Sequence, residues 1–380
     1  MALTQILPNL RADLGLDQSE GGYLVAFINI GTVLAFLLVR QADRWGRSRV
    51  LMITIAGYTL STFFSGFAPN VFVFAGLQLI ARIFLIAEWA TSMVIAAEEF
   101  PADRRGMVIG VIQGSTSLGA IVCAGLAPLL LETEWGWRTV YFVGVIPLIL
   151  LAYARRGLKE SQRFQDSRAS TEERPSFFRI WKGPYRVRML QVSLIWATTY
   201  LCTNNAITFW KEFVVAERGF SDAQVGASIS IAAVASMPLV FFAGKLLDIV
   251  GRKRGAAIIF ISCSIGIALS YGLHGQWPLT VALLFGIFGA SAVLPVLNAF
   301  TTELFPTELR GDAFAWCNNL LGRVGYVLAP AFVGLAYTHV GSYGPVIQAT
   351  TIFPIIALVL IYRMLPETGG QELEDSASLD

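Results

Sequence analysis

Two loops of this chain carry the same motif 205 positions apart, and this repeat constrains the fold more than any other feature. Gly244–Arg254 reads GKLLDIVGRKR, and Val39–Arg49 reads VRQADRWGRSR. The first loop contains Asp43, Gly46 and Arg47, and the second contains Asp248, Gly251 and Arg252, each later by 205 (248 − 43). The repeat predicts that one structural unit occurs twice in the chain.

Further loops repeat in the same order. Glu98 and Arg105 lie 205 positions before Glu303 and Arg310 (303 − 98). A third pair of loops follows with an offset of 207 (367 − 160), and its charged residues are Glu160, Arg163 and Glu367. Offsets of 205, 205 and 207 over three successive pairs of loops indicate duplication of a whole domain.

The loops separate long apolar runs. The 380 residues are 55% hydrophobic and only 14% charged, whereas about a quarter of the residues are charged in soluble proteins. A run of about 20 apolar residues crosses a bilayer as a helix. The pattern lacks the alternation of a barrel strand. We therefore predict an all-α integral membrane protein with about eleven complete spans, at 20–39, 49–68, 71–97, 106–131, 137–154, 187–213, 222–247, 255–273, 277–302, 312–337 and 343–364.

The distribution of charge predicts the orientation. Most of the 28 lysine and arginine residues fall in alternate loops, which the positive-inside rule places in the cytoplasm together with the C-terminus. We predict an N-terminal bundle over 1–154, a cytoplasmic linker over 155–186, a C-terminal bundle over 187–366 and a cytoplasmic tail over 367–380. Residues 176–181 of the linker (SFFRIW) are compatible with either plain linker or a short amphipathic helix, and we favour the linker.

The repeat also bears on the start of the chain. The second unit opens near Val187, and 187 − 205 places its counterpart before Met1. We expect the first helix to be largely missing, with Met1–Leu10 as its remainder, and the chain as given to transport poorly.

The repeated loop motif suggests a cytoplasmic gate. Gly244 allows close backbone approach, and Gly251 allows a turn that a residue with a Cβ avoids. Asp248 and the acids of the later loops can pair with the neighbouring cations, and we expect Glu303 to pair with Arg310. Such pairs, shared between two halves, would close one face and then part. The alternative is that these residues only satisfy topology.

These motifs resemble the major facilitator superfamily of secondary transporters. Gly244–Arg254 is similar to the superfamily signature, while Val39 stands in place of its glycine. LKESQRF (158–164) and LPETGGQELE (365–374) resemble sugar-porter motifs. FWKEFVVAERGFS (209–221) and NNLLGRVG (318–325) look more like aromatic-acid and metabolite proton symporters. The resemblance implies two six-helix bundles, a central cavity and alternating access.

Charged residues inside spans are functional candidates because they are costly at membrane depth. Arg82 and Glu88 share one span, and Arg323 lies in another. An arginine presents a fork that matches a carboxylate, which suits an organic anion, and Glu88 is a candidate proton carrier. Further polar candidates for a cavity wall are Asn204, Asn205, Asn298, Asn319 and Gln113. Trp210 fits a cavity or an interfacial anchor, and we favour the anchor.

The function we expect is proton-coupled symport of a small organic anion, such as an aromatic acid, by a monomer in the plasma (bacterial inner) membrane. A transporter of sugar or another neutral solute is the alternative, and a membrane sensor on the same fold is a third. The sequence contains no catalytic set, metal cluster or nucleotide loop, so we expect no enzyme activity, no cofactor and no nucleic-acid partner.

Overall fold

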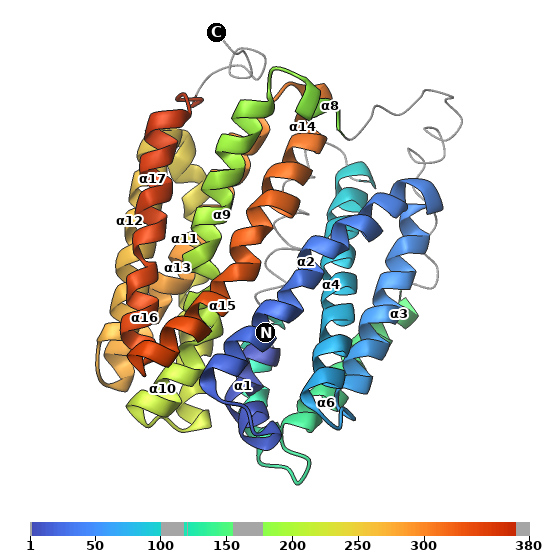
Figure 1. The fold of residues 1–380 in the computed structure, drawn as a ribbon, viewed down its shortest axis with the longest axis vertical. Helices are drawn as coiled ribbons and strands as arrows, with labels where there is room; N and C mark the ends of the chain where they lie inside the picture. The colour runs from blue at the N-terminus through green and yellow to red at the C-terminus, as the bar shows by residue number, and fades with distance from the viewer. Residues whose placement is uncertain (1, 100–117, 120, 155–177, 370–380) are drawn as a thin grey trace. The chain divides into compact units, whose positions relative to one another are not determined.

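The computed structural model describes residues 2–99, 118–119, 121–154 and 178–369, and every regular element in these ranges is helical (Figure 1). The chain divides into two compact units. The first holds Met1–Leu16 and Leu24–Arg174, and the second holds Asp17–Tyr23 and Pro175–Asp380.

Seven helices in the described ranges are long and apolar enough to cross a membrane. They are Gln18–Val39, Val71–Ser92, Asp222–Leu247, Arg252–Gly272, Gln276–Glu303, Leu309–Val340 and Tyr343–Met364. Ile121–Leu131 and Trp137–Ile146 are shorter apolar helices. The expected span at 106–131 lies partly outside the described residues.

Every regular element described in unit 1 is a helix. Its helices are α1 (Ala2–Leu14), α2 (Gln18–Trp45, whose first turns belong to unit 2), α3 (Arg47–Ser65), α4 (Val71–Glu99), Ile121–Leu131 and α6 (Trp137–Ala154). Phe74 of α4 packs edge-on against Trp137 and Tyr141 of α6, with ring centroids 5.5 and 5.8 Å apart. This aromatic cluster joins α4 to α6.

Helix α1 docks onto α6 through an apolar face and one carboxylate. Leu3, Ile6, Leu7 and Leu10 are buried at helical spacing. At its end, Asp13 accepts hydrogen bonds from Arg138 Nη1 (2.6 Å) and Trp137 Nε1 (3.0 Å). The hydrogen bond from Arg138 has the largest effect, and together with the bond from Trp137 it holds the pKa of Asp13 below its usual value, although partial burial acts to raise that pKa. The described part of the segment expected as a helix remainder, residues 2–10, therefore belongs to a helix that runs on to Leu14.

Unit 2 holds most of the described chain. Its helices are α8 (Arg179–Lys182), α9 (Arg186–Thr208), α10 (Trp210–Arg218), α11 (Asp222–Val250), α12 (Arg252–Gly272), α13 (Gln276–Glu303), α14 (Thr307–Phe314), the π-helix η1 (Ala315–Gly322), α15 (Arg323–Val340), α16 (Tyr343–Thr350) and α17 (Ile352–Met364). Within this unit the long helices run alongside one another, with α10 at one end and α8 and α14 at the other (Figure 1). The segment SFFRIW contributes to the short helix α8, which contacts α9 and α14.

Three of the expected spans in unit 2 are interrupted helices. The span expected over 187–213 breaks at Phe209, between α9 and α10. Trp210 then turns inward: it is 1% exposed, and its Nε1 donates to the carbonyl of Ser270 at 3.2 Å. The interpretation of Trp210 as an interfacial anchor is therefore wrong, because the break after α9 aims its ring into the core. The π-helix η1 lies within the span expected over 312–337, and one residue, Thr351, separates α16 from α17 in the span expected over 343–364.

Small residues allow the helices of unit 2 to pack closely. A Cβ added to Gly325 of α15 would lie 2.0 Å from the carbonyl oxygen of Ala197 on α9, and one added to Gly289 of α13 would lie 2.4 Å from the Cα of Cys263 on α12. Neither position has room for a side chain. Such contacts are typical of helices packed in membranes, where small residues let backbones approach.

Large apolar side chains remain on the outside of the helices. Phe72 of α4 is 84% exposed, and Ile249 and Phe242 of α11 are 71% and 65% exposed. In water such side chains would favour association, whereas in a bilayer they face acyl chains. The exposed surface therefore fits the spans expected from the sequence.

Candidate functional site

The glycines of the repeated motif adopt the same turn in both units. Gly46 has φ 102° and precedes α3, and Gly251 has φ 88° and precedes α12. This backbone region is open to glycine and disfavours residues with a Cβ. The turn conformation expected at Gly251 is confirmed, and the repeat extends to backbone geometry.

Gly244 differs from this pair. Among the described residues no atom lies within 4 Å of the position that its Cβ would take. The close backbone approach expected at Gly244 does not occur in this structure, because this face of α11 has no neighbouring helix against it within the described ranges.

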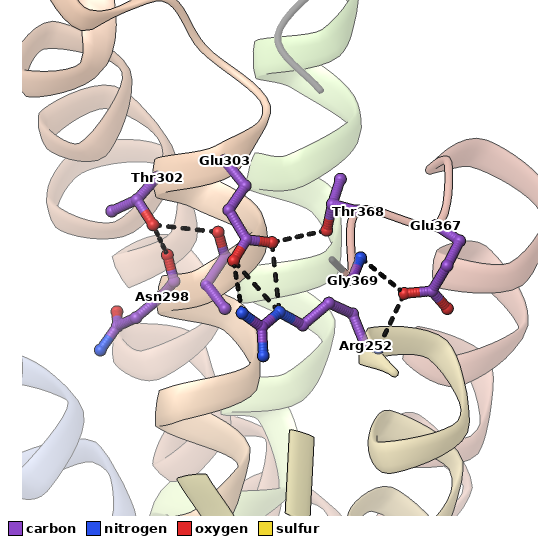
Figure 2. Close-up of polar contacts among 8 residues, drawn as sticks. Arg252, Asn298, Thr302, Glu303, Glu367, Thr368 and Gly369 are labelled. Carbon is purple, nitrogen blue, oxygen red and sulfur yellow. Dashed lines mark hydrogen bonds and ion pairs between the residues drawn. The ribbon is translucent and has the colours of Figure 1, made fainter. Parts of the chain in front are cut away.

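The turn at Gly251 presents Arg252 to an acid on another helix (Figure 2). Arg252 Nη2 lies 2.8 Å from Glu303 Oε1, and its Nε lies 3.1 and 3.3 Å from the two carboxylate oxygens. The side chains are only 17% and 13% exposed. Thr368 donates to Glu303 Oε2 at 2.5 Å. A forked, partly buried pair of this kind is stronger than an exposed one.

Glu367 binds the same turn from the other side. Its carboxylate accepts the backbone N–H groups of Arg252 (2.7 Å), Lys253 (2.9 Å) and Gly369 (3.0 Å). The first two belong to the N-terminus of α12, whose first N–H groups have no partner within the helix. Burial acts to raise the pKa of Glu367, but the backbone hydrogen bonds and the charge of Lys253 outweigh it and hold the pKa below its usual value. The carboxylate therefore caps α12.

The gate motifs of unit 2 thus converge on one cluster, Arg252, Glu303, Glu367 and Thr368, which we call the α12 cluster. All four residues belong to the same unit. The expected pairing of Glu303 with Arg310 is wrong, since Glu303 faces the start of α12. The Nε of Arg310 is buried and has no hydrogen-bond partner within the described ranges.

The remaining gate residues, and the cavity-wall candidate Gln113, are not placed. Arg105, Gln113, Glu160 and Arg163 lie outside the described residues. The backbones of Asp43, Arg47, Glu98 and Asp248 lie in helices, but their side chains fall outside the described part.

Arg323 begins α15, directly after the π-helix η1, and is half-buried. Its Cζ lies 5.2 Å from the ring centroid of Tyr200 and 5.1 Å from that of Tyr326. The two rings stand at 89°, with centroids 5.4 Å apart, and form a corner around the guanidinium. No carboxylate of the described residues pairs with Arg323, and its Nε is buried without a hydrogen-bond partner there.

Hydrogen bonds fix the helices that make this corner. Tyr200 donates to Asn318 Oδ1 at 2.8 Å, and Asn204 Nδ2 donates to the carbonyl of Tyr326 at 3.0 Å. Asn205 Nδ2 donates to the carbonyl of Ala329 at 3.1 Å. The amides of Asn204 and Asn205 therefore tie α9 to α15.

Two further candidate amides lie on α13 and η1. Asn298 of α13 is half-buried, and its Oδ1 has no hydrogen-bond partner within the described ranges. Its side-chain amide points away from the α12 cluster (Figure 2). Asn319 lies in η1 and is also half-buried.

Arg82 and Glu88 both lie on α4 of unit 1 and are half-buried. A Cβ on Gly31 of α2 would lie 3.0 Å from the Cβ of Arg82, so α2 packs closely against this part of α4. Tyr58 of α3 is within electrostatic range of both Arg82 and Glu88. Both charges therefore lie near Tyr58, and Arg82 also lies beside α2.

Comparison with known proteins identifies the family to which this helical chain belongs. The sequence profile of the Major Facilitator Superfamily matches residues 1–320 and, in a second overlapping match, residues 192–378. The chain belongs to the Major Facilitator Superfamily. It is therefore an integral membrane transporter of small molecules and not an enzyme.

Individual members of this superfamily cover nearly the whole chain. A probable 4-methylmuconolactone transporter of Cupriavidus pinatubonensis is 28% identical over 99% of this chain and 88% of its own length. A cis,cis-muconate transport protein of Acinetobacter baylyi is 27% identical over 90% and 84%. The crystal structure of a D-xylose-proton symporter, at 20% identity, superimposes with a TM-score of 0.76 over 97% of this chain and 94% of that one. The last likeness shows the fold.

Several residues of the candidate site were not predicted from the sequence. Tyr326 follows Arg323 by three positions on one helix face, a spacing that could have found it. Tyr200 and Thr368 come from distant parts of the chain, and no local signal marks them. Asn29 of α2 is 1% exposed with neither amide atom partnered in the described ranges, and only burial distinguishes it.

Proposed function

We propose that the chain is a proton-coupled symporter of small organic anions in the bacterial inner membrane, with Arg323 as the anion-binding residue. The observation that carries the proposal is the Arg323 corner. A permanent cation half-buried in a spanning segment, flanked by tyrosine rings and without a carboxylate partner in the described ranges, needs an anion to complete it.

The relatives support an acid as the substrate. Muconate is a conjugated dicarboxylate, and it is what the Acinetobacter baylyi relative carries by its name. A guanidinium binds a carboxylate through two parallel hydrogen bonds, which a neutral sugar does not offer. We therefore favour a carboxylate over the sugar of the alternative hypothesis.

Coupling to protons requires a group that titrates. The acid within a span that the sequence analysis selected as a proton carrier is Glu88, which shares α4 with Arg82. Substrate and proton then cross together in an alternating-access cycle, in which the two units rock about the binding region. Monomeric function is part of the same proposal.

The test is uptake by proteoliposomes that contain the full-length protein. Benzoate, muconate and xylose are offered with and without an inward proton gradient. We expect gradient-driven uptake of the acids, its loss in Arg323→Ala, and its retention in Arg363→Ala, which removes an exposed arginine at the end of α17. Xylose uptake without acid uptake would overturn the proposal, and so would acid uptake that survives Arg323→Ala.

A further inference from the structure

The two tyrosines around Arg323 differ in what their hydroxyl groups do. Tyr200 is 6% exposed and donates its hydroxyl hydrogen to Asn318, which is also 6% exposed. Tyr326 is half-buried, and its hydroxyl forms no hydrogen bond within the described ranges. One ring is therefore fixed, and the other offers a free polar group beside the guanidinium.

From this asymmetry, and resting on the proposed function, we infer that the corner selects planar carboxylates that carry a second polar group. Tyr200 is a positioning residue that orients the guanidinium. Tyr326 is a specificity-determining residue whose hydroxyl binds a hydroxyl or carbonyl of the substrate.

Planarity follows from the geometry of the ion pair. A carboxylate bound by both arms of a guanidinium lies in the guanidinium plane. In benzoate or muconate the carboxylate is conjugated, so the rest of the molecule continues in that plane. The rings of Tyr200 and Tyr326 stand at 89° to each other, and their centroids lie 5.2 and 5.1 Å from the Cζ of Arg323. A flat substrate can pack against the face of a tyrosine ring. A saturated substrate ring has atoms above and below its mean plane, and these would collide with the tyrosine ring.

The π-helix supplies the fixed side of the corner. A π-turn holds more residues than an α-turn, and such turns occur mostly as short pieces at functional sites. Here η1 carries Asn318, ends at Gly322 and is followed directly by Arg323. A Cβ on Gly322 would lie 2.7 Å from the Cβ of Trp196, so η1 has no room to shift toward α9. The hydrogen bond from Tyr200 to Asn318 therefore keeps a fixed position relative to Arg323.

The experiment measures initial uptake of benzoate, para-hydroxybenzoate and cyclohexanecarboxylate by proteoliposomes of the full-length protein. For the wild type we expect para-hydroxybenzoate to have a KM about tenfold lower than benzoate, the worth of one net hydrogen bond. Tyr326→Phe keeps the ring and removes only the hydroxyl, so the KM for para-hydroxybenzoate should become about equal to the KM for benzoate in this variant. Tyr200→Phe should raise the KM for both aromatic acids, because it frees the ring that orients Arg323. Cyclohexanecarboxylate, whose ring is saturated, should be taken up more weakly than benzoate by the wild type.

The outcomes separate this inference from the proposed function. Uptake of benzoate that depends on Arg323 but shows the same ratio of KM values in Tyr326→Phe would overturn the inference and leave the function standing. Absence of any carboxylate uptake would overturn both.

Competition against benzoate uptake by the unmodified protein gives a second measurement that needs no variant. Here para-hydroxybenzoate should compete about tenfold better than para-methylbenzoate, whose methyl group neither donates nor accepts a hydrogen bond, and equal competition would count against Tyr326.

Discussion

Glu303, at the end of α13, binds Arg252, at the start of α12, through two guanidinium nitrogens, with 2.8 Å between Nη2 and Oε1. Both residues lie in unit 2, together with Glu367 and Thr368. The α12 cluster therefore holds the ends of three segments of one unit together. In an alternating-access cycle such a cluster keeps one bundle rigid while the bundle moves as a body.

The fork of Arg252 is the first feature to test. Arg252→Lys keeps the charge but loses the paired geometry, because an ammonium is a point charge. We expect the variant to lose about 1.5–3 kcal/mol of unfolding free energy, the typical worth of hydrogen bonds to a charged group. Thermal unfolding of the detergent-solubilised protein measures this loss.

The control for this variant lies in the same motif. Arg254 is exposed, and Arg254→Lys should leave the unfolding temperature unchanged. Adding Glu303→Gln to Arg252→Lys should cost less than the sum of the two single changes, since the residues act as a pair. Additive losses would show that the two side chains do not interact.

Glu367 predicts a specific pH dependence. Burial acts to raise its pKa, but the hydrogen bonds from the backbone of Lys253, Gly369 and Arg252 hold the pKa below the usual 4.5. A carboxyl group whose pKa is lower in the folded state stabilises that state above its unfolded pKa, and this contribution is lost as the pH falls through the folded pKa. The unfolding temperature of the wild type should therefore fall more steeply below about pH 4.5 than that of Glu367→Gln.

The same variant has an expected effect at neutral pH. Removing the charge weakens the cap on α12, which typically costs about 1 kcal/mol. Glu134→Gln, which changes an exposed carboxylate in unit 1, serves as the matched control. If Glu367→Gln and the wild type show parallel pH profiles, the carboxylate does not titrate with unfolding and the capping role is wrong.

Features set by neighbouring residues could be predicted from the sequence, whereas contacts between residues far apart in the chain could not. The repeat predicted a special turn at Gly251, and the same turn occurs at Gly46 because both motifs need a sharp reversal before the next helix. The partner of Glu303 was missed. Sequence proximity favoured Arg310, whereas the actual partner, Arg252, lies 51 residues away and is brought close by the packing of α12 on α13.

The site around Arg323 shows the same limit. A charge in an apolar run is visible in the sequence, and the cost of burying it made Arg323 a candidate. Tyr326 lies three positions later on the same helix, within reach of a spacing argument. Tyr200 comes from α9, and only the tertiary packing of α9 against η1 and α15 brings its ring to the guanidinium. The break at Phe209 that buries Trp210 has no local signal either.

The glycines of the loop motif give a last prediction, in which two substitutions by alanine should act in opposite directions. Gly251 has φ 88°, so Gly251→Ala strains the backbone and should reduce the free energy of unfolding by about 1–2 kcal/mol. Gly244 lies inside α11 with no described atom within 4 Å of a new Cβ. There alanine lowers the entropy of the unfolded chain and should stabilise the helix by about 0.5–1 kcal/mol.

Thermal unfolding and uptake together decide what Gly244 does. Gly46→Ala should resemble Gly251→Ala, because the equivalent glycine has φ 102°. A Gly244→Ala protein that is stabilised and still transports would mean that the glycine is not needed for close approach in any state of the cycle. A stabilised protein that no longer transports would instead mean that another helix approaches this face of α11 in a second conformation. Destabilisation by Gly244→Ala would contradict the open environment seen around this residue.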